Sequence, residues 1–198
     1  GARHLRAAGD RARASYANDD AIRLYQQALA VLLTGGELEP ERLVLYERIA
    51  DLCGAAGRRN TAEEHYQSAL EGHRARQDRI GEARIVRKLG RLLWDAGKRI
   101  KAETHYAEAA NLLGGIDAPI EWAHLLQERG RLAFRTGDHV AAARWADEAL
   151  GYARSVPADA DEQGRLEAAR AIAEALNTKG VALARLGRHE EAVREVEQ

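Results

Sequence analysis

The chain contains very little of several residue types, and each shortage narrows the choice of fold. Cys53 is the only cysteine, so no disulfide can form within the chain. There are three prolines and one phenylalanine, and aromatic residues make up 5% of the 198 residues. Strands favour β-branched and aromatic side chains, whereas alanine, which is abundant here, favours helices. The composition therefore indicates an all-α protein, and the lone cysteine is in keeping with a cytoplasmic location.

No charge of one sign dominates the chain. Its 30 basic and 31 acidic side chains give a net charge of −1, so nothing global attracts it to nucleic acid or to an anionic membrane. No apolar run approaches the roughly 18–20 residues that a transmembrane helix needs. The opening residues, GARHLRAAGDRARA, also lack the apolar core of a signal peptide. We therefore expect neither a membrane nor a nucleic acid as the partner.

Methionine is absent altogether, even at the first position. The last residues, Glu197 and Gln198, lie in a helical pattern that has no stop signal. Both features lead us to expect a piece of a larger protein. A helical hairpin cut in this way exposes an apolar face, which gives a possible route to self-association.

One pattern recurs along the chain. A glycine turn lies five residues before an alanine, an aromatic or small residue follows four positions later, and another alanine comes three after that. The second to fourth units read GRRNTAEEHYQSAL, GKRIKAETHYAEAA and GDHVAAARWADEAL. The first, YANDDAIRLYQQAL, has Tyr16 in place of the glycine, and the fifth, GRHEEAVREVEQ, stops early. The marker alanines are Ala21, Ala62, Ala102, Ala142 and Ala192, which lie 41, 40, 40 and 50 residues apart.

The segment before each turn repeats as well. A small residue stands seven positions before the turn, and a large apolar residue precedes it by four. The small residues are Gly9, Ala50, Gly90, Gly130 and Gly180. Small residues let two helices approach closely, and a turn glycine tolerates the left-handed backbone at the end of a helix. One such hairpin cannot bury its apolar face alone, so the pattern predicts stacked hairpins.

The five units resemble the tetratricopeptide repeat family over nearly the whole chain. The resemblance implies an all-α, right-handed superhelical solenoid of about five antiparallel hairpins in a single domain, with units at about 2–36, 40–77, 80–115, 118–155 and 159–198. We expect helices at 2–14, 18–33, 40–56, 59–76, 79–96, 99–113, 118–136, 139–154, 160–186 and 189–198. The family's usual period is about 34 residues, so the helices or linkers here must be longer. The segments LTGGELEP, GGIDAP and SVPADAD separate the units.

A second resemblance concerns the first unit. The stretch HLRAAGDRARASYANDDAIRLYQQAL is similar to the first repeat after the ATPase core of large bacterial signalling ATPases, some of which carry a cyclase and others a transcription-activator domain. In those families the repeats act as sensor or docking arms. The resemblance implies a regulatory module of a bacterial signalling protein.

In the tetratricopeptide family the first helix of each pair lines a groove that takes peptides or partner helices. Our register assigns the second, fifth, ninth and twelfth residues of each unit to this groove. The third and fourth units place four arginines, a histidine and two aromatic residues there. The candidate binding residues are Arg84, Arg87, Arg91, Trp94, His124, Gln127, Arg131 and Phe134.

Arginine forks suit carboxylates, and aromatic rings give contact area at a low entropy cost. We therefore expect an acidic protein or peptide segment with an apolar anchor as the partner. The alternative is that an arginine-rich chain simply carries arginines on every solvated face.

Asn177 stands where many peptide-binding tetratricopeptide repeats keep an asparagine that holds the ligand backbone. The family's two-carboxylate clamp needs lysines and asparagines spread over adjacent units, and these are missing. The resemblance therefore implies peptide binding at Asn177 but excludes that clamp specificity.

Enzyme chemistry is not expected. None of the seven histidines pairs with another at metal-ligand spacing, and Cys53 falls on a packing stripe. The glycine-rich stretches TGGEL and LLGGID lack the lysine of a phosphate loop. No acid–base pair or nucleophile set emerges either, so we expect no catalytic residue, metal or cofactor.

The sequence therefore predicts a protein-interaction scaffold. A sensor arm for a small effector, controlling an attached ATPase or transcription activator, is the alternative. The two differ in whether the groove takes a segment of several residues or a compact ligand.

Overall fold

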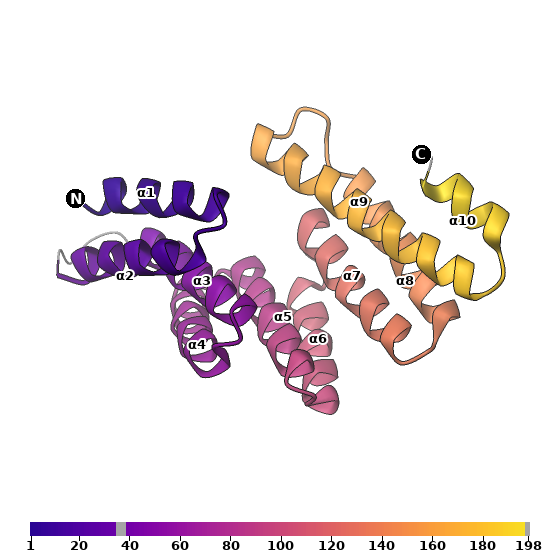
Figure 1. The fold of residues 1–198 in the computed structure, drawn as a ribbon, viewed down its shortest axis with the longest axis horizontal. Coiled ribbons are helices and arrows are strands. Elements are labelled where there is room, and N and C mark those ends of the chain that lie inside the picture. Colours follow the sequence, from indigo (N-terminus) through magenta and orange to yellow (C-terminus); the bar gives the residue numbers. More distant parts are fainter. Residues whose placement is uncertain (35–38, 197–198) are drawn as a thin grey trace. The chain divides into compact units, whose positions relative to one another are not determined.

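The computed structural model describes residues 1–34 and 39–196, and these residues form helices joined by short turns (Figure 1). The helices are α1 (Ala2–Ala14), α2 (Asn18–Thr34), α3 (Glu39–Ala55), α4 (Arg59–Ala75), α5 (Arg79–Asp95), α6 (Arg99–Leu113), α7 (Pro119–Arg135), α8 (His139–Arg154), α9 (Glu162–Arg185) and α10 (His189–Val196). The predicted all-α class is confirmed, and the helix limits agree with the predicted ones to within two residues. Half of the LTGGELEP linker (residues 35–38), and the last two residues of the predicted final helix, lie outside the described residues.

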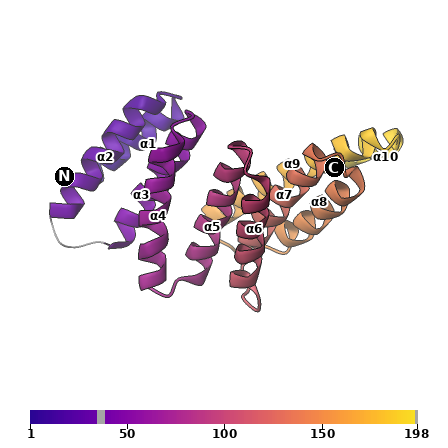
Figure 2. The same cartoon turned by 90° about the horizontal axis from the view of Figure 1, so that it is seen from below.

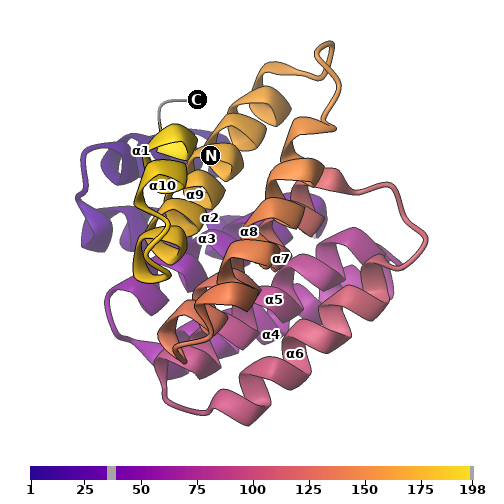
Figure 3. The ribbon, with the colours of Figure 1, turned by 90° about the vertical axis from the view of Figure 1, so that its right-hand side faces the viewer.

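The chain divides into two compact halves. The N-terminal half (Gly1–His105) contains α1 to α5 and the start of α6, and the C-terminal half (Tyr106–Gln198) contains the rest. In the first half α1 packs on α2 and α3 packs on α4, with α2 against α3 and α4 against α5 (Figure 2). In the second half α9 packs on both α7 and α8, and α10 folds back on α9 (Figure 3). Each half is therefore built by stacking hairpins.

Left-handed residues end the first helix of each hairpin, as the pattern predicts. The turn glycines have positive φ: Gly57 (75°), Gly97 (76°), Gly137 (87°) and Gly187 (77°). The amide after each one donates back to the helix end, as Asp138 N does to Ala133 O at 2.9 Å. Tyr16, at the glycine position of the first unit, has the same conformation with φ 59°.

Small residues lie where the helices cross. The marker alanines Ala21, Ala62, Ala102 and Ala142 are all 0% exposed, whereas Ala192 in the last hairpin is half-buried. Gly9 shows why size matters there. A Cβ at this position would lie 2.6 Å from Cε1 of Tyr25, which is itself fully buried. The repeat pattern therefore marks the contact points between helices.

The tryptophans of the C-terminal half belong to the packing. Trp145 packs against the buried cluster of Leu126, Leu150 and Ala175, and the guanidinium groups of two arginines lie over its ring. Trp122 stacks on Tyr152 with the ring centroids 5.5 Å apart. Among the residues described, no helix is both long and apolar enough to cross a lipid bilayer.

Candidate interaction surface

The first helix of each hairpin is called an A helix here, so the A helices are α1, α3, α5, α7 and α9. Their second, fifth, ninth and twelfth positions are the predicted binding surface, which we call the A face. Most A-face residues are exposed or half-buried, and Arg91, Asn177 and Val44 are exposed. Arg87 and Gln127 are buried, with 8% and 3% of their surface exposed. Within each half, the A-face side chains are therefore largely accessible on their helices.

A polar cluster joins the first two hairpins. Asp10 in α1 accepts a hydrogen bond from Tyr25 Oη of α2 at 2.7 Å and pairs with Arg48 of α3. Burial opposes ionisation of Asp10, but these two hydrogen bonds hold the pKa of its carboxyl below the ordinary value. Burial and the Asp10 carboxylate raise the pKa of Tyr25 to about 12. The cluster therefore ties an ionised aspartate to a protonated tyrosine and an arginine.

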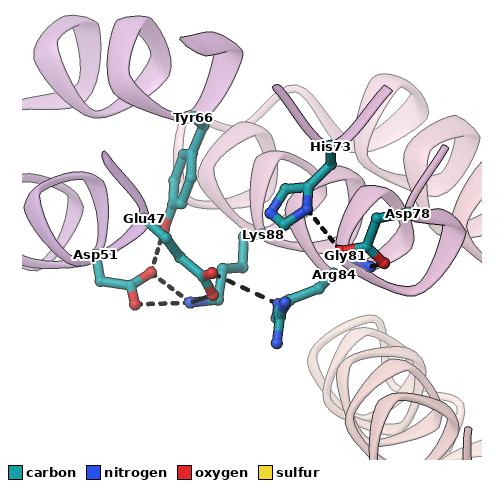
Figure 4. A network of polar contacts seen from close by, with 8 residues as sticks. All are labelled: Glu47, Asp51, Tyr66, His73, Asp78, Gly81, Arg84 and Lys88. Carbon is teal, nitrogen blue, oxygen red and sulfur yellow. Dashed lines mark hydrogen bonds and ion pairs between the residues drawn. The ribbon is translucent and has the colours of Figure 1, made fainter. Parts of the chain in front are cut away.

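The same arrangement recurs one repeat later (Figure 4). Asp51 in α3 accepts from Tyr66 Oη of α4 at 2.6 Å, and Lys88 Nζ of α5 lies 2.6 Å from Asp51 Oδ2. Asp10 and Asp51 are both ninth residues of their units, and Arg48 and Lys88 both follow a fifth residue. A tyrosine–aspartate–cation cluster therefore links each of the first two hairpins to the next A helix.

Glu47 extends the second cluster. Its Oε1 lies 2.7 Å from Lys88 Nζ, and its Oε2 lies 3.5 Å from Arg84 Nε. Burial would raise the pKa of Glu47, but the positive charges of Lys88 and Arg84 hold it below the ordinary value overall. Arg87 contributes to the same field, since its charge also favours ionised Glu47. Arg84 is thus positioned by a carboxylate of the preceding repeat, and the charge of Arg87 helps to keep that carboxylate ionised.

The other two candidates of the N-terminal half lie near the end of α5. Arg91 Nε is 3.7 Å from Asp95 Oδ2, one turn along the same helix. Trp94 is half-buried, and the guanidinium carbon of Arg99 lies 5.3 Å from the centre of its ring. These side chains give an accessible charged and aromatic pair.

In the C-terminal half the aspartate of the cluster is replaced by Arg131. Its Nη2 lies 3.0 Å from Glu174 Oε2 of α9, and its Nη1 lies 3.4 Å from Glu128 Oε1. Gln127 Nε2 donates to the Glu174 carbonyl at 2.9 Å and to Thr178 Oγ1 at 2.8 Å. Gln127 therefore holds α9 against α7, and Arg131 bridges the same two helices nearer the surface.

The remaining candidates of this half differ in exposure. His124 and Phe134 are half-buried, and Asn177 is exposed on α9. The Phe134 ring lies 5.1 Å from the His139 ring, centroid to centroid. The exposed apolar side chain of Val181, one turn after Asn177, lies on the same helix. This part of the A face thus combines an amide, an arginine and apolar groups.

Sequence reasoning missed the carboxylates that accompany the arginines. Glu47, Asp51 and Glu174 stand at A-face positions of the second and fifth units, but only the structure shows which cations they meet. A signal was present in the repeat, because an aspartate at the ninth position occurs together with a tyrosine fifteen residues later in the first two units.

A further polar group missed from the sequence lies at the turn between α4 and α5. His73 is buried, and its Nδ1 lies 2.9 Å from Asp78 Oδ2 (Figure 4). The other carboxylate oxygen of Asp78 accepts from Gly81 N at 2.9 Å and caps α5. A Cβ on Gly81 would lie 2.2 Å from His73 Nδ1, so the glycine makes room for the ring. This group fixes the turn that leads into α5.

The described part of the chain holds no group of three or more His, Cys, Asp or Glu side chains that could bind a metal ion. Cys53 is 1% exposed, and burial raises the pKa of its thiol, which lowers its reactivity. The chemistry available on the A face is therefore that of ion pairs, hydrogen bonds and apolar contact.

Comparison with known proteins places the fold. No family model and no curated protein sequence matches the chain. Among solved structures, BtubC (BKLC) from P. vanneervenii matches with a TM-score of 0.68 and 20% identity over 96% of this chain and 74% of that one. The apo quorum sensor NprR from B. thuringiensis matches with a TM-score of 0.73 and 16% identity over 98% of this chain.

A putative kinesin light chain with TPR-like repeats from Podosopora anserina gives a TM-score of 0.64 at 16% identity, covering 98% of this chain and 91% of that one. The fold is therefore that of tetratricopeptide-like helical repeat proteins. The chain spans 51% of the length of NprR.

Proposed function

We propose that this chain is a protein-interaction module that binds a peptide or partner helix along its A face. The observation that carries the proposal is that Arg84, Arg91 and Arg131 on the A face are accessible and already held in place by ion pairs. Binding then costs little side-chain entropy, because the rotamers are fixed before the partner arrives. NprR, which shares the fold, is also solved in complex with its cognate peptide NprX.

The partner that suits this surface is an acidic segment with an apolar anchor. In the N-terminal half its carboxylates would replace Glu47 on Arg84 and Asp95 on Arg91, and its anchor would contact Trp94. Arg87 is buried and would act by positioning Glu47. Each exchange trades one ion pair for another, so the expected gain is specificity more than affinity.

A segment bound to the C-terminal half alone would compete with Glu174 for Arg131 and lay an apolar group near Phe134. Asn177 would bond to the partner's backbone, and His124 would line the same face. Gln127 is buried and would act by holding α9 against α7.

The regulatory role follows from the resemblance of the first unit to the repeats of bacterial signalling ATPases. We propose that the module docks or senses a partner on behalf of a larger signalling protein in the cytoplasm.

Peptide selection tests the proposal. A library of displayed random peptides is selected on the wild-type chain, and binders are measured against a charge-reversed variant carrying Arg84→Glu, Arg91→Glu and Arg131→Glu. Arg23→Glu on α2 is the matched control, since Arg23 is an exposed arginine off the A face. We expect enriched acidic peptides that lose at least about tenfold in affinity for the triple variant and keep it for the control.

Enriched peptides that bind the triple variant normally would place the interaction elsewhere. If no peptide is enriched but a compact metabolite raises the melting temperature in a ligand screen, the effector-sensor function replaces the one proposed.

A further inference from the structure

Two arginines of α1 differ from the other A-face arginines. Arg6 is half-buried and Arg13 is exposed, and both lie on the A face of the first hairpin. They are seven residues apart, which places their Cα atoms about 10 Å apart along the helix. They therefore present two guanidinium groups along one side of α1.

Neither of these arginines has an acidic partner within the described residues. Arg84, Arg91 and Arg131 each pair with a carboxylate. Among residues 1–34 and 40–195, no carboxylate lies within ion-pair distance of Arg6 or Arg13. This difference does not follow from composition, because all five are arginines on the same face of the repeats.

The carboxylate between them is already engaged. Asp10 lies one turn after Arg6 and three residues before Arg13, and it accepts from Tyr25 and pairs with Arg48. The charge of Arg6 contributes to the lowered pKa of Asp10, and the charge of Arg13 is felt by Tyr25. Three positive charges, those of Arg48, Arg6 and Arg13, therefore lie near the single negative charge of Asp10. The net charge of this group is positive.

We infer that Arg6 and Arg13 form a recognition site for an acidic protein segment whose two carboxylates are three residues apart in the polyproline II conformation. This inference rests on the proposed function and names where on the A face an acidic partner is held. A polyproline II segment advances about 3.1 Å per residue and completes a turn every three residues, so carboxylates three residues apart lie on one side, about 9 Å apart, close to the spacing of about 10 Å between the arginines. Each guanidinium can then bind one carboxylate through a pair of parallel hydrogen bonds.

A protein segment fits this surface better than a nucleic acid. Asp10 lies between the two arginines along α1, and Glu41 lies 3.9 Å from Arg3 on the same helix face. A phosphate backbone carries a charge at every nucleotide and would meet these carboxylates, whereas a peptide with spaced acids leaves neutral residues opposite them.

Fluorescence anisotropy with labelled peptides tests the inference. One peptide carries two glutamates separated by two alanines, and a second of the same composition carries the two glutamates side by side. Both are titrated with the wild type, with Arg6→Glu/Arg13→Glu, and with Arg6→Gln/Arg13→Gln in case the reversed charges unfold α1 beside Asp10. Arg11→Glu is the matched control, because Arg11 lies in the last turn of the same helix but faces away from the A face.

We expect the spaced peptide to bind more tightly than the adjacent one. Both double variants should bind the spaced peptide at least about tenfold more weakly than the wild type does, and Arg11→Glu should change this affinity by less than about twofold. Equal binding of the two peptides, or unchanged binding to a folded glutamine variant, would overturn the inference.

The same titrations distinguish a failure of this inference from a failure of the proposed function. If binding of the spaced peptide is lost only in the Arg84→Glu/Arg91→Glu/Arg131→Glu variant, the A face binds acidic segments but α1 is not the site. If a single-stranded oligonucleotide binds through Arg6 and Arg13 while the spaced peptide does not, the partner is nucleic acid and the inference is wrong.

Discussion

At the scale of single residues, the clusters around Asp10 and Asp51 explain how this chain joins its repeats. Each aspartate lies on an A helix and accepts a hydrogen bond from the tyrosine of its own hairpin. Each also forms an ion pair with a cation of the next hairpin. Each carboxylate has a charged and a neutral hydrogen-bond donor but is only partly buried. It therefore contributes to folding stability without the large desolvation cost of a fully buried ion.

Replacing Asp51 tests this view. Asp51→Ala removes the acceptor of Tyr66 Oη and one partner of Lys88, and we expect it to lower the free energy of unfolding by about 1–3 kcal/mol. Tyr66→Phe should cost about 1 kcal/mol, and the double variant should cost less than the sum because the two groups share one bond. Urea unfolding followed by circular dichroism measures all three. Asp95→Ala, which breaks an exposed pair within α5, should cost less than about 1 kcal/mol, and a similar loss at both aspartates would contradict the cluster's role.

Alanine substitutions at two helical glycines, Gly9 and Gly151, distinguish the effect of close packing on stability from that of helix propensity. A Cβ at Gly9 meets the Tyr25 ring, so Gly9→Ala should destabilise the chain by about 1–3 kcal/mol despite the better helix propensity of alanine. Gly151 lies within α8 with nothing within 4 Å of its Cβ position, so Gly151→Ala should stabilise by about 0.5–1 kcal/mol. The melting temperatures of the two variants show whether each substitution stabilises or destabilises the chain. Two changes of the same sign would show that the close approach at Gly9 is not limiting.

At the scale of elements, α10 depends on contacts made by one lysine. Lys179 of α9 lies 2.6 Å from Asp147 Oδ1 of α8 and 2.7 Å from Glu195 Oε1 of α10. Burial disfavours its charge, but hydrogen bonds to these two carboxylates raise the pKa of Lys179 overall. The lysine therefore joins three helices, and it adds a polar link to the packing of α10, a helix of eight described residues, on α9.

We expect Lys179→Met to loosen α10 while the rest of the C-terminal half stays folded. The methionine keeps the apolar stem but leaves Glu195 without its cation, so amide exchange in α10 should rise by about tenfold or more. Hydrogen exchange read by mass spectrometry follows α7, α8 and α10 separately. Arg185→Met, an exposed change near the end of α9, is the control and should leave α10 as protected as in the wild type.

At the scale of the whole molecule, the same carboxylates set the dependence of stability on pH. The pKa values of Asp10, Glu47 and Asp78 are all lowered in the folded chain. Their contribution is present above the unfolded pKa values of about 4 and is lost as the pH falls through the lower folded values. The pKa of Tyr25 is raised to about 12, so its contribution is full below about pH 10 and is lost as the pH rises through about 12.

Burial also lowers the pKa of His65, so its contribution falls below about pH 6.5, and we therefore expect a plateau of stability between about pH 7 and pH 9 with a fall on both sides. Urea midpoints measured across this range give the profile. In Tyr25→Phe the alkaline fall should be smaller and the acid fall should remain. An unchanged alkaline limb in that variant would show that another group controls it.

The sequence alone determined the helices and the places where they touch. The turn glycines and the buried alanines recur with the repeat because backbone conformation and close helix approach are local demands that one residue type meets. Tyr16 shows that the repeat register predicts a left-handed residue even where glycine is missing. The arrangement in one domain stays a prediction, as does binding at the candidate residues.

Only the tertiary structure decided how the A-face charges are paired. Helix phase places Arg84 and Arg131 on the A face, but their partners Glu47 and Glu174 come from neighbouring repeats 37 and 43 residues away in the chain. The same phase does not show that Gln127 turns inward to bond α9, or that Arg6 and Arg13 keep no carboxylate partner in the described chain. A long side chain can reach several neighbours from one helical position, so its partner depends on how the hairpins stack, which a pattern within one repeat does not contain.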